Sequence, residues 1–228
     1  MRLDKFILKS TTLTKAECLS VIQNKQILVN GEAVNDAAFQ VHENNIILLA
    51  GERLYARPFR YLLLNKAPQT ICSNQDGVYP SIFNLIDINN SETLHIAGRL
   101  DVDTTGLLLI TDNGRWTFNI TSPKNDCIKI YRVGLLKAFD TSTIDLFEKG
   151  MKLLGEDKLT KPAFIKVVNE KEVLLTLSEG KFHQVKRMFF TAKNKVVSLH
   201  REQIGQVKLD VEEGQWRYLT DDEINSFH

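Results

Sequence analysis

Residues 97–114 read AGRLDVDTTGLLLITDNG and change from polar to apolar near their midpoint. The polar part holds Arg99, Asp101 and Asp103. The apolar part, Leu107–Thr111, is typical of a strand buried on both faces. A loop that runs directly into a buried strand is held rigidly, and such loops often carry function. Aspartate and threonine also shape turns through side-chain hydrogen bonds to the backbone, so this stretch alone leaves a purely structural role open.

A second informative stretch is SEGKFHQVKRMFF, residues 178–190, which predicts a helix over Lys181–Ala192. Helical spacing places three apolar side chains on one face: Phe182, Val185 and Phe189. It places three cationic side chains together on another: His183, Lys186 and Arg187. Such a stripe can pair with a carboxylate or with phosphates, although taken alone it is also typical of a solvated helix face.

A third stretch, KIYRV at residues 129–133, alternates as a strand does, with Lys129, Tyr131 and Val133 on one side. A tyrosine there could stack on a base, although such a residue more often belongs to the core. In all, strands are expected at Tyr61–Leu64, Leu107–Thr111, Ile128–Leu135, Ala163–Val168, Val173–Ser178 and Val196–Leu199. Two more helices are expected at Asn113–Asn119 and Ser142–Met151. Many strands with few crossover helices predict an α+β domain whose mixed sheet is largely antiparallel and flanked by helices.

The first 50 residues read as a small separate module. A helix is predicted over residues 2–9 and another after Thr14, where Glu17 completes a capping box. Asn30-Gly31 predicts a hairpin, and Asn45–Leu49 a further strand. Residues 51–60 have the composition of a linker. We therefore expect two domains, residues 1–56 and 57–228.

Positive charge is concentrated in this first module, because the whole chain carries a net charge of only +1. Residues 1–25 contain two acidic side chains, Asp4 and Glu17, against five basic ones, a local balance of +3. The basic residues are Arg2, Lys5, Lys9, Lys15 and Lys25. A nucleic-acid surface would have to come from such clustering and not from overall charge.

The cysteines and the apolar runs of the sequence indicate where in the cell the protein is expected to lie. The three cysteines lie far apart in the sequence, which favours reduced thiols in the cytoplasm over a disulfide scaffold or a CxxC metal site. No apolar run reaches the roughly 18 residues of a membrane span, and the N-terminus lacks a signal-peptide core. We expect a cytoplasmic protein without a membrane segment. We also expect a monomer, because no heptad or exposed apolar stripe stands out.

The first module resembles the S4 RNA-binding domain, which carries an RLDKFL-like helix and a VNG hairpin, matched here by RLDKFI at residues 2–7 and VNG at 29–31. The resemblance implies that basic side chains on the two helices contact RNA phosphates and supply affinity without reading sequence. Members of that family usually have arginine where this chain has Lys15 and Lys25. The positive charge is retained, but bidentate phosphate contacts would be lost.

The remaining motifs together resemble the pseudouridine synthases that modify small-subunit ribosomal RNA. The matching segments are GRLDVDTTGLLLITDNG at 98–114, ITSP at 120–123, KIYRV at 129–133, KLTKPA at 158–163, EGKFHQVKRMF at 179–189 and LHREQIG at 199–205. The resemblance implies that one uridine of 16S ribosomal RNA, uridine 516, is flipped out and isomerised. It implies a partially assembled small-subunit particle as partner and no cofactor.

The family's functional residues carry over individually. Asp101 matches the essential aspartate, a nucleophile or anion stabiliser at the flipped base. Lys186 matches the basic residue that pairs with this aspartate and would keep it ionised despite burial. Tyr131 matches a tyrosine that packs against the uracil and assists proton removal from C5. Arg99 matches an arginine that occupies the space left by the flipped nucleotide, and Arg187 is expected among the RNA contacts.

Other residues near these motifs are expected to be structural. Thr105 and Gly106 would shape the loop, and Asp103 and Asp112 would stabilise it. His95, His183 and His200 lack partners at metal-ligand spacing, so no metal site is expected. Two departures from the family concern the backbone: KAPQ at residues 66–69 replaces a KPxG turn, and a glycine usually found near Lys193 is missing.

Three alternative functions fit the sequence less well. A non-catalytic RNA-binding or ribosome-assembly protein would not need Asp101, Tyr131 and Lys186, yet all three are present. An aspartic hydrolase would need two coupled carboxylates, whereas the DTTG at 103–106 has an extra threonine and no second copy. A DNA-binding regulator fits poorly with the near-zero net charge and the large second domain.

Overall fold

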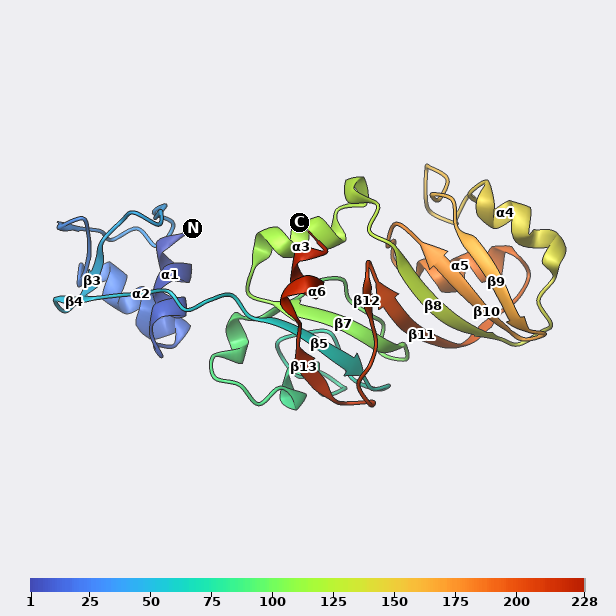
Figure 1. Cartoon of the computed structure of the whole chain (residues 1–228), viewed down its shortest axis with the longest axis horizontal. Helices are drawn as coiled ribbons and strands as arrows, with labels where there is room; N and C mark the ends of the chain where they lie inside the picture. The colour runs from blue at the N-terminus through green and yellow to red at the C-terminus, as the bar shows by residue number, and fades with distance from the viewer. Residues whose placement is uncertain (228) are drawn as a thin grey trace. The chain divides into compact units, whose positions relative to one another are not determined.

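The computed structural model describes residues 1–227 and divides the chain into two compact units, Met1–Phe59 and Arg60–His228 (Figure 1). The division lies a few residues after the expected position between residues 56 and 57. Phe59 joins the first unit because the Lys9 ammonium lies 3.2 Å from the centroid of its ring. Within residues 1–227, no helix is both long and apolar enough to cross a membrane.

The first unit combines two helices with a small sheet. The helices are α1 (Leu3–Ser10) and α2 (Lys15–Gln23), and the sheet order is β2 (Glu32–Ala33), β1 (Ile27–Val29), β3 (Ile47–Leu49) and β4 (Glu52–Arg53). The capping box is present, since Thr14 Oγ1 accepts from the Glu17 amide and the Glu17 carboxylate accepts from the Thr14 amide. Asn30 and Gly31 adopt positive φ angles of 52° and 91°, as a tight hairpin requires.

The expected linker over residues 51–60 was wrong in its first part. Glu52 and Arg53 form β4, which pairs with β3 across a turn at Ala50-Gly51. Leu54 then packs against the core of the first unit. The sequence suggested a linker because a strand of two residues is too short to show any alternation.

The second unit is built on a nine-stranded sheet, which confirms the α+β class. Its main order is β13 (Trp216–Tyr218), β5 (Tyr61–Lys66), β7 (Thr105–Thr111), β11 (Val196–Ile204), β8 (Lys129–Leu135), β10 (Glu172–Leu177) and β9 (Phe164–Asn169). Two short strands complete it: β6 (His95–Ile96) beside β7 and β12 (Val207–Lys208) beside β11. Among the pairs of these strands within residues 1–227, only β7–β11 is parallel.

The two leucine-rich strands β5 and β7 are buried on both faces. One face places Leu64 and Leu108 in a core with Phe189, and the other places Leu63 and Leu109 in a second core with Trp116. This explains why the run Leu107–Thr111 shows no polar alternation. On the second face, α6 (Asp221–Asn225) lies beside α3 (Gly114–Thr121), and the Trp116 indole donates to the Ile224 carbonyl at 3.0 Å (Figure 1).

The helix expected over Lys181–Ala192 begins later than the sequence suggested. α5 spans Gln184–Thr191, because His183 has φ 47° and cannot continue a right-handed helix. The predicted apolar face is therefore wrong at one position. Val185 and Phe189 are buried, whereas Phe182 precedes the helix and is 76% exposed.

The helix predicted over Ser142–Met151 also differs from the observed structure. Its first residues form the 3₁₀ helix η4 (Thr141–Thr143), and α4 covers only Ile144–Glu148. Gly150 then ends the helix with a positive φ of 79°. The remaining 3₁₀ helices are η1 (Ile82–Leu85), η2 (Ser91–Thr93) and η3 (Pro123–Asn125).

Candidate active site

The polar loop over residues 97–104 connects β6 to its antiparallel neighbour β7. A fully buried lysine, Lys66 at the end of β5, holds one side of this loop. Its ammonium donates to the carbonyls of Val102 at 3.2 Å and Thr104 at 2.9 Å, and also to that of Ala67. Burial lowers the pKa of Lys66. The lysine therefore fixes the backbone on the C-terminal side of Asp101.

A buried arginine, Arg201 on β11, holds the other side of the loop. It is 2% exposed, and its guanidinium donates to the carbonyls of Gly98 and Leu107 at 2.8 Å each. It also donates to the hydroxyl of Tyr131 at 3.4 Å. No ion pair joins Arg201 to an acidic side chain in the part of the chain that the structure describes. Its charge is satisfied by carbonyls and the tyrosine, so it links the loop to β7 and β8.

The junction between β7 and β11 depends on Gly106. This glycine has φ 104° and pairs with Arg201 across the parallel strands. A Cβ placed here would lie 2.6 Å from the Arg201 backbone nitrogen and would also collide with its carbonyl oxygen. Gly106 thus permits the close approach that brings Arg201 under the loop.

Asp101 lies between the side chains of Lys186 and His183. Its Oδ2 accepts from the Lys186 ammonium at 3.0 Å, and its Oδ1 lies 3.4 Å from Nε2 of His183. The Asp101 side chain is 30% exposed, so it is half-buried. The pairing with Lys186 joins α5 to the loop across 85 residues of sequence.

Lys186 also contacts a second carboxylate, Asp103, at 2.7 Å. Burial opposes the charge on Lys186, but its bonds to Asp103 and Asp101 outweigh this effect and raise its pKa. The hydrogen bond from Lys186 lowers the pKa of Asp103 in turn, against a smaller opposing effect of burial. Lys186 is therefore a fixed positive charge at neutral pH, shared by both aspartates.

Tyr131 on β8 lies beside this charged group. It is 9% exposed and points inward together with Lys129 and Val133, as the alternation predicted. Tyr131, Asp101 and Lys186 line a narrow pocket of about 70 Å³. The pocket adjoins a wider cavity of about 510 Å³, which Asp101 also lines. The structure thus brings together all three residues expected to be catalytic.

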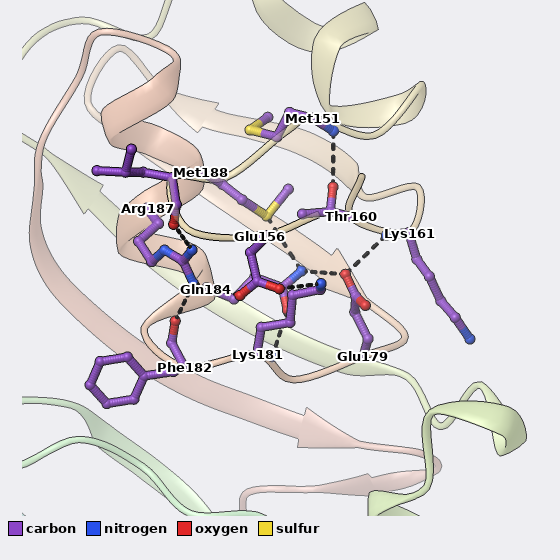
Figure 2. A network of polar contacts seen from close by, with 11 residues as sticks. Met151, Glu156, Thr160, Lys161, Glu179, Lys181, Phe182, Gln184, Arg187 and Met188 are labelled. Atoms are coloured by element: carbon purple, nitrogen blue, oxygen red, sulfur yellow. Dashed lines mark hydrogen bonds and ion pairs between the residues drawn. The ribbon is translucent and has the colours of Figure 1, made fainter. Parts of the chain in front are cut away.

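The two arginines expected to contact RNA occupy different surroundings. Arg99 is exposed and lines both cavities, and no hydrogen bond or ion pair holds its guanidinium within residues 1–227. Arg187 is held by other groups of the protein, although it was expected among the RNA contacts. It pairs with Glu156 at 3.1 Å and donates to the carbonyls of Phe182 and Leu154 (Figure 2).

The basic residues of the first unit also differ in exposure. Lys5, Lys15 and Lys25 are exposed, and Arg2 is exposed while paired with Asp4 at 2.8 Å. Lys9 is only 8% exposed and lies over the Phe59 ring, so the expected presentation of this side chain at the surface was wrong. Nothing in the sequence indicated this difference, because Phe59 follows Lys9 by 50 residues.

The histidines do not form a metal site in the described chain, where no three His, Cys, Asp or Glu side chains gather as ligands. His95 contacts Thr117, and His200 contacts Thr105 through Nδ1 at 2.8 Å. The Asp112 carboxylate accepts hydrogen bonds from the Arg60 amide at 2.9 Å and from the Arg60 guanidinium at 3.0 Å. These bonds give Asp112 a structural role at the start of β5.

Comparison with protein families adds an independent observation. The model of the RNA pseudouridylate synthase family matches residues 60–190, and that of the S4 domain matches residues 1–47. The chain belongs to the RNA pseudouridylate synthase family.

Relatives of this synthase match it over almost its whole length. The ribosomal small subunit pseudouridine synthase A of Vibrio parahaemolyticus is 45% identical over 230 residues, covering 99% of each chain. The protein of the same name from Escherichia coli K12 is 42% identical over 229 residues, again covering 99% of each. A crystal structure of a pseudouridylate synthase superposes with a TM-score of 0.74 at 42% identity and covers both chains fully.

Sequence reasoning missed two residues of the synthase site, Lys66 and Arg201. Arg201 carried a usable signal, because it follows Leu199 at the inward spacing of a strand, where an arginine needs a specific partner. Lys66 carried a similar signal at the end of the apolar run of β5. His183 was expected on a stripe that could pair with a carboxylate, but the sequence did not indicate the left-handed backbone on which its contact with Asp101 depends.

Proposed function

We propose that this synthase isomerises one specific uridine of 16S ribosomal RNA to pseudouridine, with Asp101 as the nucleophile. The observation that carries the proposal is the half-buried Asp101 carboxylate held by Lys186 in a pocket lined by Tyr131. The choice of RNA is supported by relatives, 42–45% identical over 99% of the chain, whose names specify the ribosomal small subunit.

The reaction conserves all atoms of the nucleotide. The bond between uracil N1 and ribose C1′ breaks, and a bond between C5 and C1′ forms. C5 loses its proton and N1 gains one, so neither an oxidant nor a cofactor is consumed. The uracil must leave the base stack to reach the narrow pocket. The Asp101 carboxylate can attack either C1′ or the uracil ring, and its hydrogen bond from Lys186 would orient it in both routes.

Two further side chains have proposed positions around the flipped nucleotide. The Tyr131 ring would pack against the uracil, with its hydroxyl oriented by Arg201 toward the proton leaving C5. Arg99, which has no protein partner within residues 1–227, would enter the space that the nucleotide vacates. Its exposed guanidinium is suited to stacking and to phosphate contacts.

The S4 domain would bind the RNA backbone through Arg2, Lys5, Lys15 and Lys25, which are exposed. Lys9 and Arg187 were expected in the same role, but the burial of Lys9 and the ion pair of Arg187 favour structural roles. We further propose that the substrate is a partially assembled small-subunit particle in the cytoplasm, and that the enzyme acts as a monomer.

The test is pseudouridine formation on partially assembled small-subunit particles, on naked 16S RNA and on large-subunit RNA, with the native protein beside Asp101→Asn. This substitution keeps the side-chain shape and removes the charge. We expect the native protein to modify one uridine of the small-subunit substrate and Asp101→Asn to modify none. Equal activity of the two proteins would exclude Asp101 as nucleophile. Retained RNA binding without product on any substrate would favour the assembly-factor alternative.

A further inference from the structure

An exposed pair of stacked rings lies at the mouth of the active site. Phe182 is 76% exposed, and its ring centroid lies 3.8 Å from that of His183 at an interplanar angle of 21°. A large apolar side chain at this exposure contributes little to folding, because most of its surface remains in water. Its flat outer face is free to receive another planar group.

The backbone beneath this pair is held firmly from several sides (Figure 2). The Arg187 guanidinium donates to the Phe182 carbonyl at 3.0 Å. Glu156 pairs with Arg187 at 3.1 Å and with Lys181 at 2.8 Å, and the Lys181 amide donates to the Gln184 side chain. Figure 2 shows the Phe182 ring pointing away from this network. The network thus fixes the segment while leaving the ring exposed.

His183 connects the ring pair to catalysis. Its φ of 47° is a strained conformation for a residue with a side chain, and strain of this kind is concentrated at functional sites. This conformation lets the imidazole contact Phe182 on one side and Asp101 on the other, at 3.4 Å. A ligand stacked on Phe182 would therefore be in fixed register with the Asp101 carboxylate.

The space beside the rings has the size and charge for a nucleotide. Phe182 and His183 line the cavity of about 510 Å³ together with Asp101 and Arg99. This volume lies within the roughly 300–1,000 Å³ of small-ligand sites. The narrow pocket of about 70 Å³ beyond Asp101 leaves no room for a second base. The guanidinium of Arg99 lies at the same opening and can meet a phosphate.

We propose that Phe182 and His183 form a stacking platform for the nucleobase adjacent to the target uridine. This inference rests on the proposed RNA substrate and adds a subsite for the neighbouring nucleotide. Stacking on an aromatic ring accepts any base, so the platform would contribute affinity and position without reading sequence. It would hold the flanking nucleotide while the uridine enters the pocket.

The test uses full-length protein and short single-stranded RNAs with one central uridine, flanked by 2-aminopurine on the 5′ or the 3′ side. A matched RNA of each kind carries an abasic ribose in place of the 2-aminopurine. Affinity is measured with native protein, Phe182→Ala, Phe182→Trp and the control Phe190→Ala, which removes a ring of 78% exposure outside both cavities. Quenching of 2-aminopurine fluorescence reports stacking directly.

We expect Phe182→Ala to weaken binding of one base-containing RNA by about 5-fold or more, and to abolish its quenching. The same variant should bind the abasic RNAs as the native protein does, while Phe182→Trp and Phe190→Ala retain full affinity. An equal loss on base-containing and abasic RNA, or no loss on either flank, would overturn the platform. These assays do not require product, so they are independent of whether native protein forms pseudouridine on small-subunit particles.

Discussion

Two carboxylates, Asp101 and Asp103, share the single ammonium of Lys186, yet their surroundings differ. Asp101 is 30% exposed, lines the narrow pocket and has a second neighbour, His183, at 3.4 Å. Asp103 is 66% exposed and lines neither cavity of the site. Position and desolvation, more than the shared ion pair, therefore distinguish the proposed nucleophile from its neighbour.

This difference predicts losses of activity of very different size for substitutions at the two partners of the Lys186–Asp103 contact. Lys186→Met should lower kcat by about 100-fold or more, because it removes the charge that orients and balances Asp101. Asp103→Asn should lower kcat by less than about 5-fold, since Lys186 keeps its bond to Asp101. Both should change stability by about 1 kcal/mol or less, as partly exposed ion pairs usually do. Single-turnover pseudouridine formation and denaturant unfolding measure these effects. An equal loss of kcat in both variants would give Asp103 a catalytic role.

The pH dependence of stability is expected to depend on His200, which contacts Thr105 where the loop enters β7. Burial lowers the pKa of His200 below its ordinary 6.5, with smaller contributions from nearby charges. The unfolded chain then binds a proton that the folded chain excludes. The resulting stability is complete above pH 6.5 and is lost as pH falls through the lower folded value.

We therefore expect the free energy of unfolding of native protein to fall between pH 7.5 and pH 5.5. His200→Gln should show a smaller fall over this window, which lies above the ordinary carboxyl range of about 4. The control is His42→Gln, at an exposed position in the first unit. Parallel curves for native protein and His200→Gln would contradict the assignment.

At the scale of elements, the apolar runs of β5 and β7 were predictable because burial on both faces leaves a continuous hydrophobic signal. The start of α5 was not, because the helical period continues through Phe182 and His183 although the backbone does not. The two departures from the family pattern have a common structural outcome. Gln69 and Lys193 adopt φ angles of 58° and 59°, the conformation that glycine favours. The turns keep this shape without glycine.

The close approach of β7 and β11 predicts that the fold is sensitive to a side chain at Gly106. Gly106→Ala should destabilise the protein by about 3 kcal/mol or more, because the Cβ meets the Arg201 backbone and φ is 104°. Gly114→Ala is the matched control, since a Cβ there meets nothing within 4 Å and alanine favours the first turn of α3. Denaturant unfolding measures both. A tolerated Gly106→Ala would show that the two strands can separate without loss of the fold.

At the scale of the whole molecule, each unit has its own hydrophobic core: one in Met1–Phe59, and one on each face of the sheet in Arg60–His228. Compact motifs predicted two domains. The family resemblance predicted that Asp101, Tyr131 and Lys186 share a site, and these residues do line one pocket. The sequence could not predict the buried supports of the loop, because Lys66 and Arg201 act through backbone carbonyls that only the folded chain brings together.

Separate cores predict that residues 60–228 fold without the S4 domain. This fragment should unfold cooperatively and bind RNA with a weaker salt dependence. Loss of contacts from Arg2, Lys5, Lys15 and Lys25 should reduce the slope of log affinity against log salt by about 3. Replacing these four residues by alanine in the full chain should reproduce the change. An unaltered slope in either protein would place phosphate binding outside the S4 domain.

The parallel pairing of β7 with β11 also has a consequence for synthesis of the protein. Thr105 and His200, which meet in this pairing, are separated by 95 residues, and Asp101 meets Lys186 across 85. A nascent chain therefore carries Asp101, the proposed nucleophile, long before Lys186 and His183 emerge from the ribosome. Because contacts of such long range form late and slowly, the leucine-rich β5 and β7 remain only partly covered during this interval. The S4 domain, whose contacts are local, is complete first, so the growing polypeptide acquires RNA affinity before it acquires catalytic activity.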